Sequence, residues 1–528
     1  MMVATETVSI ESIVRLQTSG EIDAAIDLGR RLVASEPSHQ ARHLLGTLLL
    51  QGQQPAEAIE ILGPLAAETS DSVTRLHLAL AQRKIGAVDA AEMTLRSLID
   101  DHPGLAEAYY NLGLVLLDTR PLDTRPLDTR PLDTRSLEAV EAFEHAVRLR
   151  PDWAQAIGNL GVAYNRSGDR AAARRAYEAA TIVAPEWVVP WHNLGELRLL
   201  DGETDGAIDA FDRALTLGPD FVPSRLNRAY ALLQLGRWQE GWREHEWRFG
   251  GAHTPPREGW EHTPVWRGQP LDGDLVVVWT EQGLGDSLQY VRFIEAIADR
   301  GGVPHVQAAP CLAALLATAS GVDTVFTDQP PGPVDYQIPL MSLPQVLGIK
   351  GDVEPTRTAY LRPPVDPPTI ATKAIRATSG PRVGVVWRSG RQYAQAARRD
   401  LDLASLETLA SADGVSFFGL QYEGAPPIET MIDLSPYLGD FATTAAIVDE
   451  LDLVITVDTA MAHLAGALGK PCWVLLSQPA DWRWLEKRDD TPWYPRTRLF
   501  RQTTPGDWRE PIADLVEALH SEPFDPAK

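Results

Sequence analysis

The 528-residue sequence is poor in cysteine, in long apolar runs and in basic residues. Its two cysteines, Cys311 and Cys472, lie far apart and lack metal-ligand spacing, which argues against a disulfide or zinc framework and favours two ordinary core residues. No run reaches the ~20 apolar residues of a membrane span, and the N-terminus has no basic region followed by an apolar core. We therefore expect a cytoplasmic protein without a membrane span.

The charge balance is acidic, with 72 Asp and Glu against 48 Lys and Arg and a formal net charge of −24. This balance argues against nucleic acid or an anionic membrane surface as the main partner, although it leaves room for a local basic pocket that holds a phosphate. The chain is too long for a single core, and at roughly 100 to 200 residues per domain it implies about three units.

The first 250 residues have a helical pattern that repeats, with Pro151, Pro185 and Pro219 each 34 residues apart. Aligning on these prolines places Ala173, Tyr177 and Ala180 on Ala207, Phe211 and Ala214. A helix-turn-helix unit that stacks on copies of itself has this spacing, with small residues where two helices cross and an aromatic ring that fills the gap. The pattern resembles tetratricopeptide repeats, most closely over residues 104–250. It predicts an α-solenoid of about seven units over residues 1–250.

One unit of this array is interrupted by "LDTRPLDTRPLDTRPLDTR", residues 117–135. The five-residue period is perfect, so slippage during replication of the coding DNA is the simplest origin. Proline at every fifth position excludes a continuous helix. We expect an exposed loop between the two helices of one repeat, without a function of its own.

In the aligned register an asparagine recurs in four successive units, as Asn111, Asn159, Asn193 and Asn227. Stacking would set these side chains in a row along the concave surface. A primary amide donates and accepts hydrogen bonds, so such a row can bind a peptide backbone without contacting its side chains. Alternatively, each asparagine bonds only to the neighbouring repeat.

The pattern changes after residues 251–272, a linker rich in proline and glycine. Short apolar strands then alternate with helices, which predicts parallel sheets with helices on both faces. We expect two Rossmann-like lobes with a cleft between them, over residues 273–365 and 380–515. The expected strands are "DLVVVW", "VPHVQAA" and "DYQIPL" in the first lobe and "RVGVVW", "VSFFGLQ", "LDLVITVD" and "PCWVLL" in the second. One helix is expected over residues 284–300.

The stretch "TEQGLGDSLQYVRF" (280–293) places a glycine-rich turn between the first of these strands and that helix. Turns of this kind usually hold a phosphate. This one lacks the third glycine of G-x-G-x-x-G, and Asp286 follows Gly285 where an anion would least tolerate a carboxylate. Gly283 and Gly285 still predict a tight turn.

A second stretch, "DLVITVDTAMAHLAGALGKP" (452–471), joins a buried strand to a helix at Asp458 and Thr459. The backbone amides of Thr459, Ala460 and Met461 would be free at the helix N-terminus, where the helix dipole favours an anion such as a diphosphate. Asp458 could accept hydrogen bonds from sugar or ribose hydroxyls, or it could simply cap the helix.

Within the same stretch, His463 lies one turn into the helix, where it could donate toward a phosphate or pack inward. A third stretch, "WRSGRQYAQAARRD" (387–400), follows a strand of the second lobe and carries Arg388, Arg391, Arg398 and Arg399. Arginines at a strand end facing a diphosphate would stabilise the charge of a leaving group. The alternative is a loop of solvated arginines.

Three strings of the second half resemble one known family: "EQGLGD", "VDTAMAHLAGALGKP" and "DWRWLEKRDDTPWYPRTRLFRQTTPGDW" (481–508). They are similar to the catalytic region of bacterial tetratricopeptide-fused glycosyltransferases, over about residues 270–515. That region is similar in turn to the heptosyltransferases of glycosyltransferase family 9, and its layout resembles O-GlcNAc transferase. The resemblance implies a GT-B fold and inverting transfer from a nucleotide sugar, without a metal.

The resemblance also implies roles for individual residues. Asp286 matches the aspartate that serves as general base in the heptosyltransferases, so the glycine turn would aim a carboxylate into the cleft. Asp458, Thr459 and His463 match the donor loop, in which Ala460 replaces a glycine. The lysine that those enzymes use near the donor phosphate has no clear counterpart, and Arg388 or Arg399 is the candidate substitute.

The sequence therefore predicts a glycosyltransferase that modifies a serine or threonine hydroxyl of a protein acceptor recruited by the repeats. Flagellin is the first candidate acceptor, because bacterial enzymes of this architecture are associated with it. The nucleotide sugar would be a co-substrate, with no cofactor and no metal. Two alternatives stay open: a scaffold whose glycosyltransferase half is inactive, and an enzyme that acts on lipopolysaccharide or polysaccharide. Repeat arrays often pair through a convex face, so a homodimer is also an option.

Overall fold

The structure is a computed structural model that describes residues 9–118, 134–250, 260, 262–330, 332–350, 359–390, 396–422 and 424–521. The described residues up to Pro190 belong to one compact unit, and those from Trp191 onward belong to a second. Each unit is considered by itself below.

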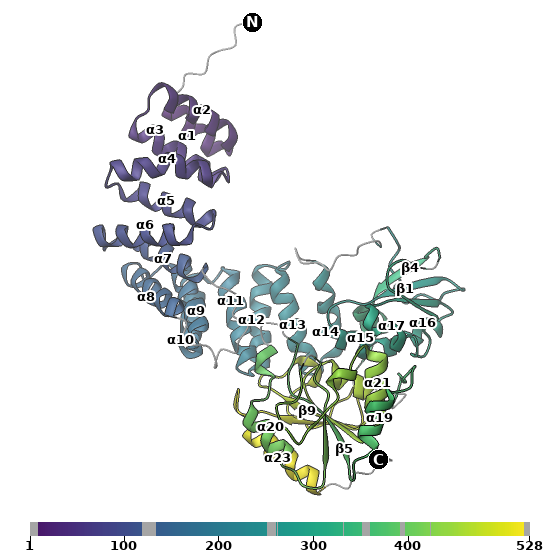
Figure 1. Ribbon diagram of the computed structural model, residues 1–528. Coiled ribbons are helices and arrows are strands. Elements are labelled where there is room, and N and C mark those ends of the chain that lie inside the picture. The colour runs from purple at the N-terminus through teal and green to yellow at the C-terminus, as the bar shows by residue number, and fades with distance from the viewer. Residues whose placement is uncertain are drawn as a thin grey trace. The chain divides into compact units, whose positions relative to one another are not determined.

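Fourteen helices run through the described residues before 246, and they pair as successive antiparallel hairpins (Figure 1). They are α1 (Ile10–Ser19), α2 (Ile22–Ser35), α3 (His39–Gln51), α4 (Pro55–Glu68), α5 (Ser72–Lys84), α6 (Val88–Asp101), α7 (Ala106–Asp118), α8 (Thr134–Leu149), α9 (Ala154–Ser167), α10 (Arg170–Val183), α11 (Val188–Leu200), α12 (Thr204–Leu217), α13 (Val222–Gln234) and α14 (Trp238–His245). A 3-10 helix, η1 (Glu246–Phe249), follows α14.

The hairpins pack as the small and aromatic residues predict, with a glycine of the first helix against a large side chain of the second. A Cβ on Gly161 would lie 2.5 Å from the ring of Tyr177, and a Cβ on Gly195 would lie 2.5 Å from Phe211. Both rings are buried. Because the glycine leaves room for the ring, the two helices of each repeat can approach closely.

Most of the "LDTRP" segment lies outside the described residues, so the expected loop over 117–135 stays a prediction. Its described ends are helical, since Asp118 ends α7 and Thr134 begins α8. The linker expected over 251–272 is also only partly described.

The first lobe contains a parallel four-stranded sheet with the strand order β3-β2-β1-β4. Its elements are β1 (Leu275–Trp279), α15 (Leu284–Tyr290), η2 (Val291–Phe293), α16 (Glu295–Ala298), β2 (Val303–Gln307), α17 (Pro310–Leu316), β3 (Thr324–Phe326), β4 (Tyr336–Pro339), η3 (Leu340–Ser342) and α18 (Leu343–Leu347).

The second lobe contains a parallel six-stranded sheet with the strand order β10-β9-β8-β5-β6-β7. Its elements are α19 (Thr369–Arg376), β5 (Arg382–Val386), η4 (Ala396–Arg398), α20 (Leu403–Ala410), β6 (Ser416–Gly419), β7 (Ile432–Asp433), η5 (Ser435–Tyr437), α21 (Phe441–Asp449), β8 (Leu453–Val457), α22 (Ala460–Ala467), β9 (Cys472–Leu476), η6 (Trp482–Trp484), β10 (Thr497–Arg501) and α23 (Arg509–Ser521).

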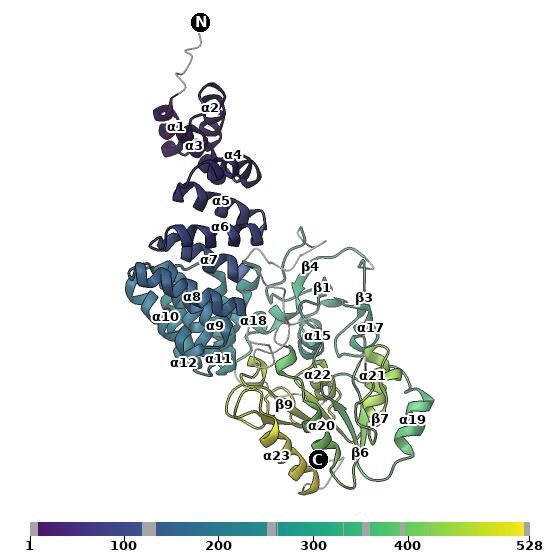
Figure 2. The ribbon, with the colours of Figure 1, turned by 60° about the vertical axis from the view of Figure 1, so that its left-hand side comes forward.

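Helices fill the space between the two sheets in both views, where α15 packs on α22 and α17 packs on α21 (Figure 2). Helices α20 and α23 pair on the other face of the six-stranded sheet. One apolar core joins α14 to both lobes and includes Trp238 and Trp242 of α14 together with Tyr290 and Trp493 of the lobes, while a second core lies between the six-stranded sheet and helices α20 and α23. Helix α14 therefore shares a core with the lobes.

The single helix expected over residues 284–300 is wrong. Helix α15 ends at Tyr290 and is followed by η2 and α16. The carbonyl of Leu288 accepts a hydrogen bond from the Tyr360 hydroxyl (2.9 Å), and the carbonyl of Gln289 accepts one from Arg292 Nε (2.8 Å). These carbonyls would otherwise accept the next bonds of the α-helical ladder, so the side chains end the helix there.

The seven expected strands are present, and the sequence patterns missed three others, β3, β7 and β10. Among the residues that the structure describes, no helix is long and apolar enough to cross a membrane.

Candidate functional site at the facing ends of α15 and α22

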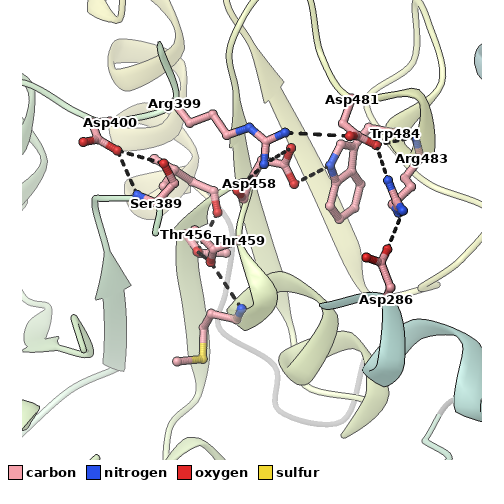
Figure 3. A network of polar contacts seen from close by, with 12 residues as sticks. Asp286, Ser389, Arg399, Asp400, Thr456, Asp458, Thr459, Asp481, Arg483 and Trp484 are labelled. Atoms are coloured by element: carbon pink, nitrogen blue, oxygen red, sulfur yellow. Dashed lines mark hydrogen bonds and ion pairs between the residues drawn. The ribbon is translucent and has the colours of Figure 1, made fainter. Parts of the chain in front are cut away.

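The glycine turn after β1 directs Asp286 toward the second lobe (Figure 3). Gly283 is the N-cap of α15, and Asp286 Oδ2 accepts a hydrogen bond from the Gly283 backbone N–H at 2.8 Å. Asp286 Oδ1 accepts a hydrogen bond from Nη2 of Arg483 in η6. The turn thus holds a carboxylate of the first lobe against a guanidinium of the second.

Gly285 lets the beginnings of two helices touch. A Cβ on Gly285 would lie 2.8 Å from Cδ2 of His463 and 3.5 Å from the Cα of Ala460, both in α22. Any other residue would therefore push α15 away from α22. The stretches around Asp286 and Asp458, 172 positions apart in the sequence, are brought together at this contact.

Helix α22 begins at Ala460, one residue later than expected, with Thr459 as its N-cap, and the Met461 amide that was expected to be free is bonded to the Thr459 side chain. Thr459 Oγ1 accepts a hydrogen bond from the Met461 N–H at 3.2 Å, and Ala460 is the first helical residue. The alternative that Asp458 caps this helix is wrong, because the Asp458 carboxylate is held elsewhere. Its Oδ1 accepts from the Trp484 indole N–H at 2.8 Å, and its Oδ2 lies 3.2 Å from Arg399 Nη1.

Five charged side chains alternate in sign from Asp286 to Asp458 (Figure 3). Arg483 Nη1 lies 2.9 Å from Asp481 Oδ1, and Arg399 Nη2 lies 3.7 Å from Asp481 Oδ2. Arg399 also donates from Nη1 to the Asp458 carbonyl at 3.1 Å. Three carboxylates against two guanidiniums leave one negative charge, so the charges of this network largely cancel one another.

Burial and these neighbours shift the protonation of the network. Burial raises the pKa of Asp458, and Arg399 opposes this shift. Burial also works to raise the pKa of Asp481, but Arg483 and Arg399 outweigh it and hold that pKa below its ordinary value. Burial works to lower the pKa of Arg483, yet Asp286 and Asp481 hold it well above the ordinary value. Arg483 therefore stays charged at any ordinary pH.

His463 packs inward, the second of the two orientations expected from the sequence. The ring is buried, its Nδ1 lies 2.8 Å from the Tyr494 hydroxyl, and it stacks on Trp484 with ring centroids 5.4 Å apart. Burial, with a further contribution from Arg483, lowers the pKa of His463 to about 3. The imidazole is therefore neutral near pH 7 and adds no positive charge to the site.

The two arginines considered for the missing lysine differ. Arg399 belongs to the charge network, whereas the exposed Arg388 stands at the end of β5, where its backbone N–H donates to Gln421 Oε1 at 3.0 Å. Arg398 lies in η4, and Arg391 lies outside the described residues.

The backbone beside the site is strained. Gln282 next to the glycine turn and Leu485 and Lys487 after η6 have φ values of 60°, 55° and 54°. Residues with a side chain seldom adopt such angles, and they cluster at functional sites when they occur. The strain thus lies in the two segments that carry Asp286 and Arg483.

Sequence reasoning missed Asp481, Arg483 and Trp484 as site residues, although the string "DWRW" contains them. It also missed a buried ion pair behind the glycine turn. Arg248 of η1 donates from Nη2 and Nε to the Glu281 carboxylate at 2.8 and 2.9 Å. A side chain of the segment that follows the last repeat thus holds the first residue of "EQGLGD".

The four asparagines of the repeats fall in both units, and three of them donate within the protein. Asn111 bonds the Glu107 carbonyl (2.8 Å), Asn159 the Tyr110 hydroxyl (3.1 Å) and Asn227 the Glu196 carboxylate (2.8 Å). Asn193 is half-buried. The bonds of Asn159 and Asn227 reach the preceding repeat, as in the alternative in which each asparagine bonds a neighbouring repeat, whereas the bond of Asn111 stays within α7. The peptide-binding role stays a prediction.

Within the described part of the chain, no group of three or more His, Cys, Asp or Glu side chains is placed to hold a metal ion.

Comparison with known families finds tetratricopeptide repeats in two places, residues 74–104 and 192–241. The chain therefore contains these repeats, as the 34-residue spacing predicts. Stacked repeats of this class present extended surfaces to other proteins.

Among curated proteins, the chain is similar to Protein FlbA of Caulobacter vibrioides, with 30% identity over 328 residues. The similarity covers 55% of this chain and 54% of that protein, so the chain spans about half the length of the curated relative it matches.

Similar solved structures include MamA from Desulfovibrio magneticus RS-1 (20% identity, 35% of this chain and 96% of that one, TM-score 0.30). A tetratricopeptide repeat protein from Thermus thermophilus has 22% identity over 37% of this chain and 100% of that one, with a TM-score of 0.31. Another, from Parabacteroides merdae, has 13% identity over 47% of this chain and 93% of that one, with a TM-score of 0.38.

Proposed function

We propose that the protein transfers a sugar from a nucleotide-sugar donor to a hydroxyl of a protein acceptor, in a GT-B arrangement, with inversion and without a metal. One observation carries the proposal. Gly285 lies against Ala460 and His463, which brings the next residue, Asp286 of helix α15 in the first lobe, close to the beginning of helix α22 in the second lobe. Asp286 and Asp458 both follow the carboxyl ends of strands, where sheets of this class bind ligands.

The donor side of this site would hold the diphosphate. The N-terminus of α22 offers the Ala460 amide and the positive end of the helix dipole. The guanidiniums of Arg399 and Arg483 lie in the same network, and arginine binds phosphate with charge-assisted hydrogen bonds. These arginines take the part that the resemblance gives to a lysine.

In the transfer step, the oxygen of the acceptor hydroxyl attacks the anomeric carbon of the donor sugar. The bond from that carbon to the phosphate oxygen breaks, and its electron pair leaves with the nucleotide phosphate. Asp286 takes the hydroxyl proton as general base. The arginines and the α22 amide stabilise the negative charge on the departing phosphate.

The repeats would supply the acceptor. Repeat surfaces bind other proteins, and the resemblance to repeat-fused bacterial glycosyltransferases makes flagellin the first candidate. The similarity to Protein FlbA covers about half of each chain and leaves the acceptor to experiment.

A scaffold with an inactive second half is the alternative, and one observation favours it. Both oxygens of Asp286 already accept hydrogen bonds, one from Gly283 and one from Arg483. These two hydrogen bonds compete with an acceptor hydroxyl for the carboxylate oxygens.

A panel of nucleotides and nucleotide sugars, followed by thermal unfolding, separates the two functions. A ligand at about 100 times its Kd adds roughly 2.7 kcal/mol of stability and raises the midpoint. We expect a shift with one nucleoside diphosphate and its sugar conjugates. If no nucleotide or nucleotide sugar shifts the midpoint, the scaffold is the better description.

The donor that binds is then tested for transfer to purified flagellin, with the mass increment of the acceptor as readout. We expect Asp286→Asn to lower turnover by about 10² to 10⁴-fold while donor binding persists, because general-base catalysis contributes that much. Asp323→Asn, at an exposed aspartate of the same lobe, is the matched control and should be as active as the natural protein. Near-normal turnover in Asp286→Asn would remove Asp286 from the role of base.

A further inference from the structure

The ion pair between Asp286 and Arg483 occupies the group on which catalysis would depend. The two side chains are only 13% and 11% exposed, and Asp286 Oδ1 and Oδ2 are both engaged. Arg483 thus covers one of the two oxygens that would have to accept the hydroxyl proton. While this pair is in place, an acceptor hydroxyl competes with Arg483 for Asp286 Oδ1.

Arg483 has binding capacity that the described structure leaves unused. Its Nη1 is anchored by Asp481 at 2.9 Å, and its guanidinium lies over the Trp482 ring at 4.2 Å. Its Nε–H is buried and has no hydrogen-bond partner among the described residues. Buried donors are nearly always paired in native proteins, so an unpaired one calls for an explanation.

Asp286 links the same guanidinium to the N-terminal end of α22. Asp286, to which it is bonded, is the neighbour of Gly285, and Gly285 lies against Ala460 and His463 at the start of that helix. A phosphate group at the α22 N-terminus would thus compete with Asp286 for Arg483. Guanidiniums bind phosphates with paired, charge-assisted hydrogen bonds, so a phosphate is a strong competitor.

We infer that Arg483 exchanges partners when the donor binds: it leaves Asp286 for the diphosphate, and the freed carboxylate becomes the acceptor for the hydroxyl proton. This inference rests on the proposed function and assigns Arg483 as a phosphate-binding residue of that site. In this exchange the diphosphate takes the place of Asp286 in the ion pair with Arg483.

The exchange predicts energetic coupling between Asp286 and Arg483 in anion binding. Pyrophosphate is the probe, titrated into the full-length protein by calorimetry at fixed pH and ionic strength. We expect Asp286→Asn to bind pyrophosphate about tenfold more tightly, because no carboxylate competes for the guanidinium, and Arg483→Gln to bind it about tenfold more weakly. In the Arg483→Gln background, Asp286→Asn should change the Kd by less than about twofold.

The double variant distinguishes partner exchange from simple charge repulsion. A carboxylate that only repels the anion would give the same tightening with or without Arg483, and additive effects of this kind would overturn the inference. Arg376→Gln removes an exposed arginine paired with Glu450 and should leave the Kd unchanged. If Arg483→Gln folds poorly, Arg483→Lys replaces it, because lysine keeps a positive charge at the buried position. Arg483→Lys should weaken pyrophosphate binding, but less than Arg483→Gln.

The two proposals can fail separately. If the natural protein binds pyrophosphate and transfers sugar but the cycle shows no coupling, the exchange is wrong and the glycosyltransferase stands. If the natural protein binds neither pyrophosphate nor any nucleoside diphosphate, both proposals fail.

Discussion

The acidic and arginine side chains of the site are charged and paired, whereas His463 is neutral. Asp286, Arg483, Asp481 and Arg399 neutralise one another in pairs, so none of these charges lies isolated in the protein interior. An isolated buried charge is costly, whereas a paired one is tolerated. His463 is enclosed by Tyr494 and Trp484, and its burial keeps the imidazole neutral.

The neutral His463 should make stability depend on pH. In the folded protein it binds a proton only near its pKa of about 3, while an unfolded histidine binds one near pH 6.5. The unfolded chain therefore holds more protons between these values, and the contribution of His463 to stability falls as the pH drops from 6.5 toward 3. At pH 5 the loss is about 2 kcal/mol, since each unit corresponds to about 1.4 kcal/mol.

Urea unfolding of the natural protein and of His463→Gln, at pH 7 and at pH 5, measures this effect. The gap in unfolding free energy between them should shrink by about 2 kcal/mol at the lower pH, because the variant has no imidazole to protonate. His520→Gln, at an exposed histidine of α23, should show no such change. If the difference in unfolding free energy between the two proteins is the same at both pH values, the pKa of His463 is not lowered in the folded protein.

Asp286, Asp458 and Arg399 could be found from the sequence because they follow strands at the ends where ligands bind. Asp481 and Arg483 could not be found in this way. They lie in and directly before η6, a single 3-10 turn outside any periodic pattern, and only the packing of η6 between the lobes brings them to the site.

Among helices and strands, the repeat helices and seven strands were predicted, and strands β3, β7 and β10 were not. The repeat helices alternate small and large residues over whole turns, and the buried strands are continuous apolar runs. Strands β3 and β7 have three and two residues, which is too short for a pattern. The break after α15 depends on the Tyr360 hydroxyl, which comes from 72 residues away in the chain and which no local propensity reveals.

The contact between α15 and α22 depends on the glycine at position 285. Gly285→Ala would place a methyl group 2.8 Å from Cδ2 of His463, and that ring is held by Tyr494 and Trp484. Alanine normally stabilises a helix relative to glycine, but overpacking at a fixed neighbour costs about 1 to 3 kcal/mol. We therefore expect Gly285→Ala to lower the urea midpoint.

Gly439→Ala is the matched control, because a Cβ at that position would meet nothing within 4 Å. If Gly285→Ala has the same urea midpoint as the control, the contact between α15 and α22 accommodates a methyl group. Their close approach would then play no part in assembling the site.

Helix α14 and η1 pack against the lobes, which limits where a truncation can separate the repeats from them. Trp242 of α14 packs edge-on against Tyr290 and Trp482, with ring centroids 5.9 and 5.6 Å apart. Arg248, just after α14, holds the buried Glu281. The last hairpin and η1 are therefore part of the unit that carries the candidate site, whatever their sequence pattern.

A truncation at residue 250 should consequently damage the site itself. It leaves Glu281 as a buried carboxylate without its arginine, which costs about 3 to 5 kcal/mol, and it removes the large buried Trp242, which costs about 3 to 5 kcal/mol more. Removal of residues 1–184 keeps α11 to α14 and η1, and the remaining unit should still unfold cooperatively in urea.

In the full chain, Arg248→Met should reproduce the loss of stability at Glu281. Arg237→Met, at an exposed pair with Glu240, should cost less than about 1 kcal/mol.

The shorter deletion then tests acceptor recruitment without disturbing the donor site. If the repeats bring a protein acceptor, the protein without residues 1–184 should keep its thermal shift with the donor nucleotide and lose transfer to flagellin. Because Asp286, Arg483 and their partners all lie beyond residue 191, loss of donor binding in this variant is not expected. Undiminished transfer to flagellin would show that the first ten helices do not recruit it. If this variant transfers sugar to a saccharide and not to flagellin, the acceptor is a carbohydrate.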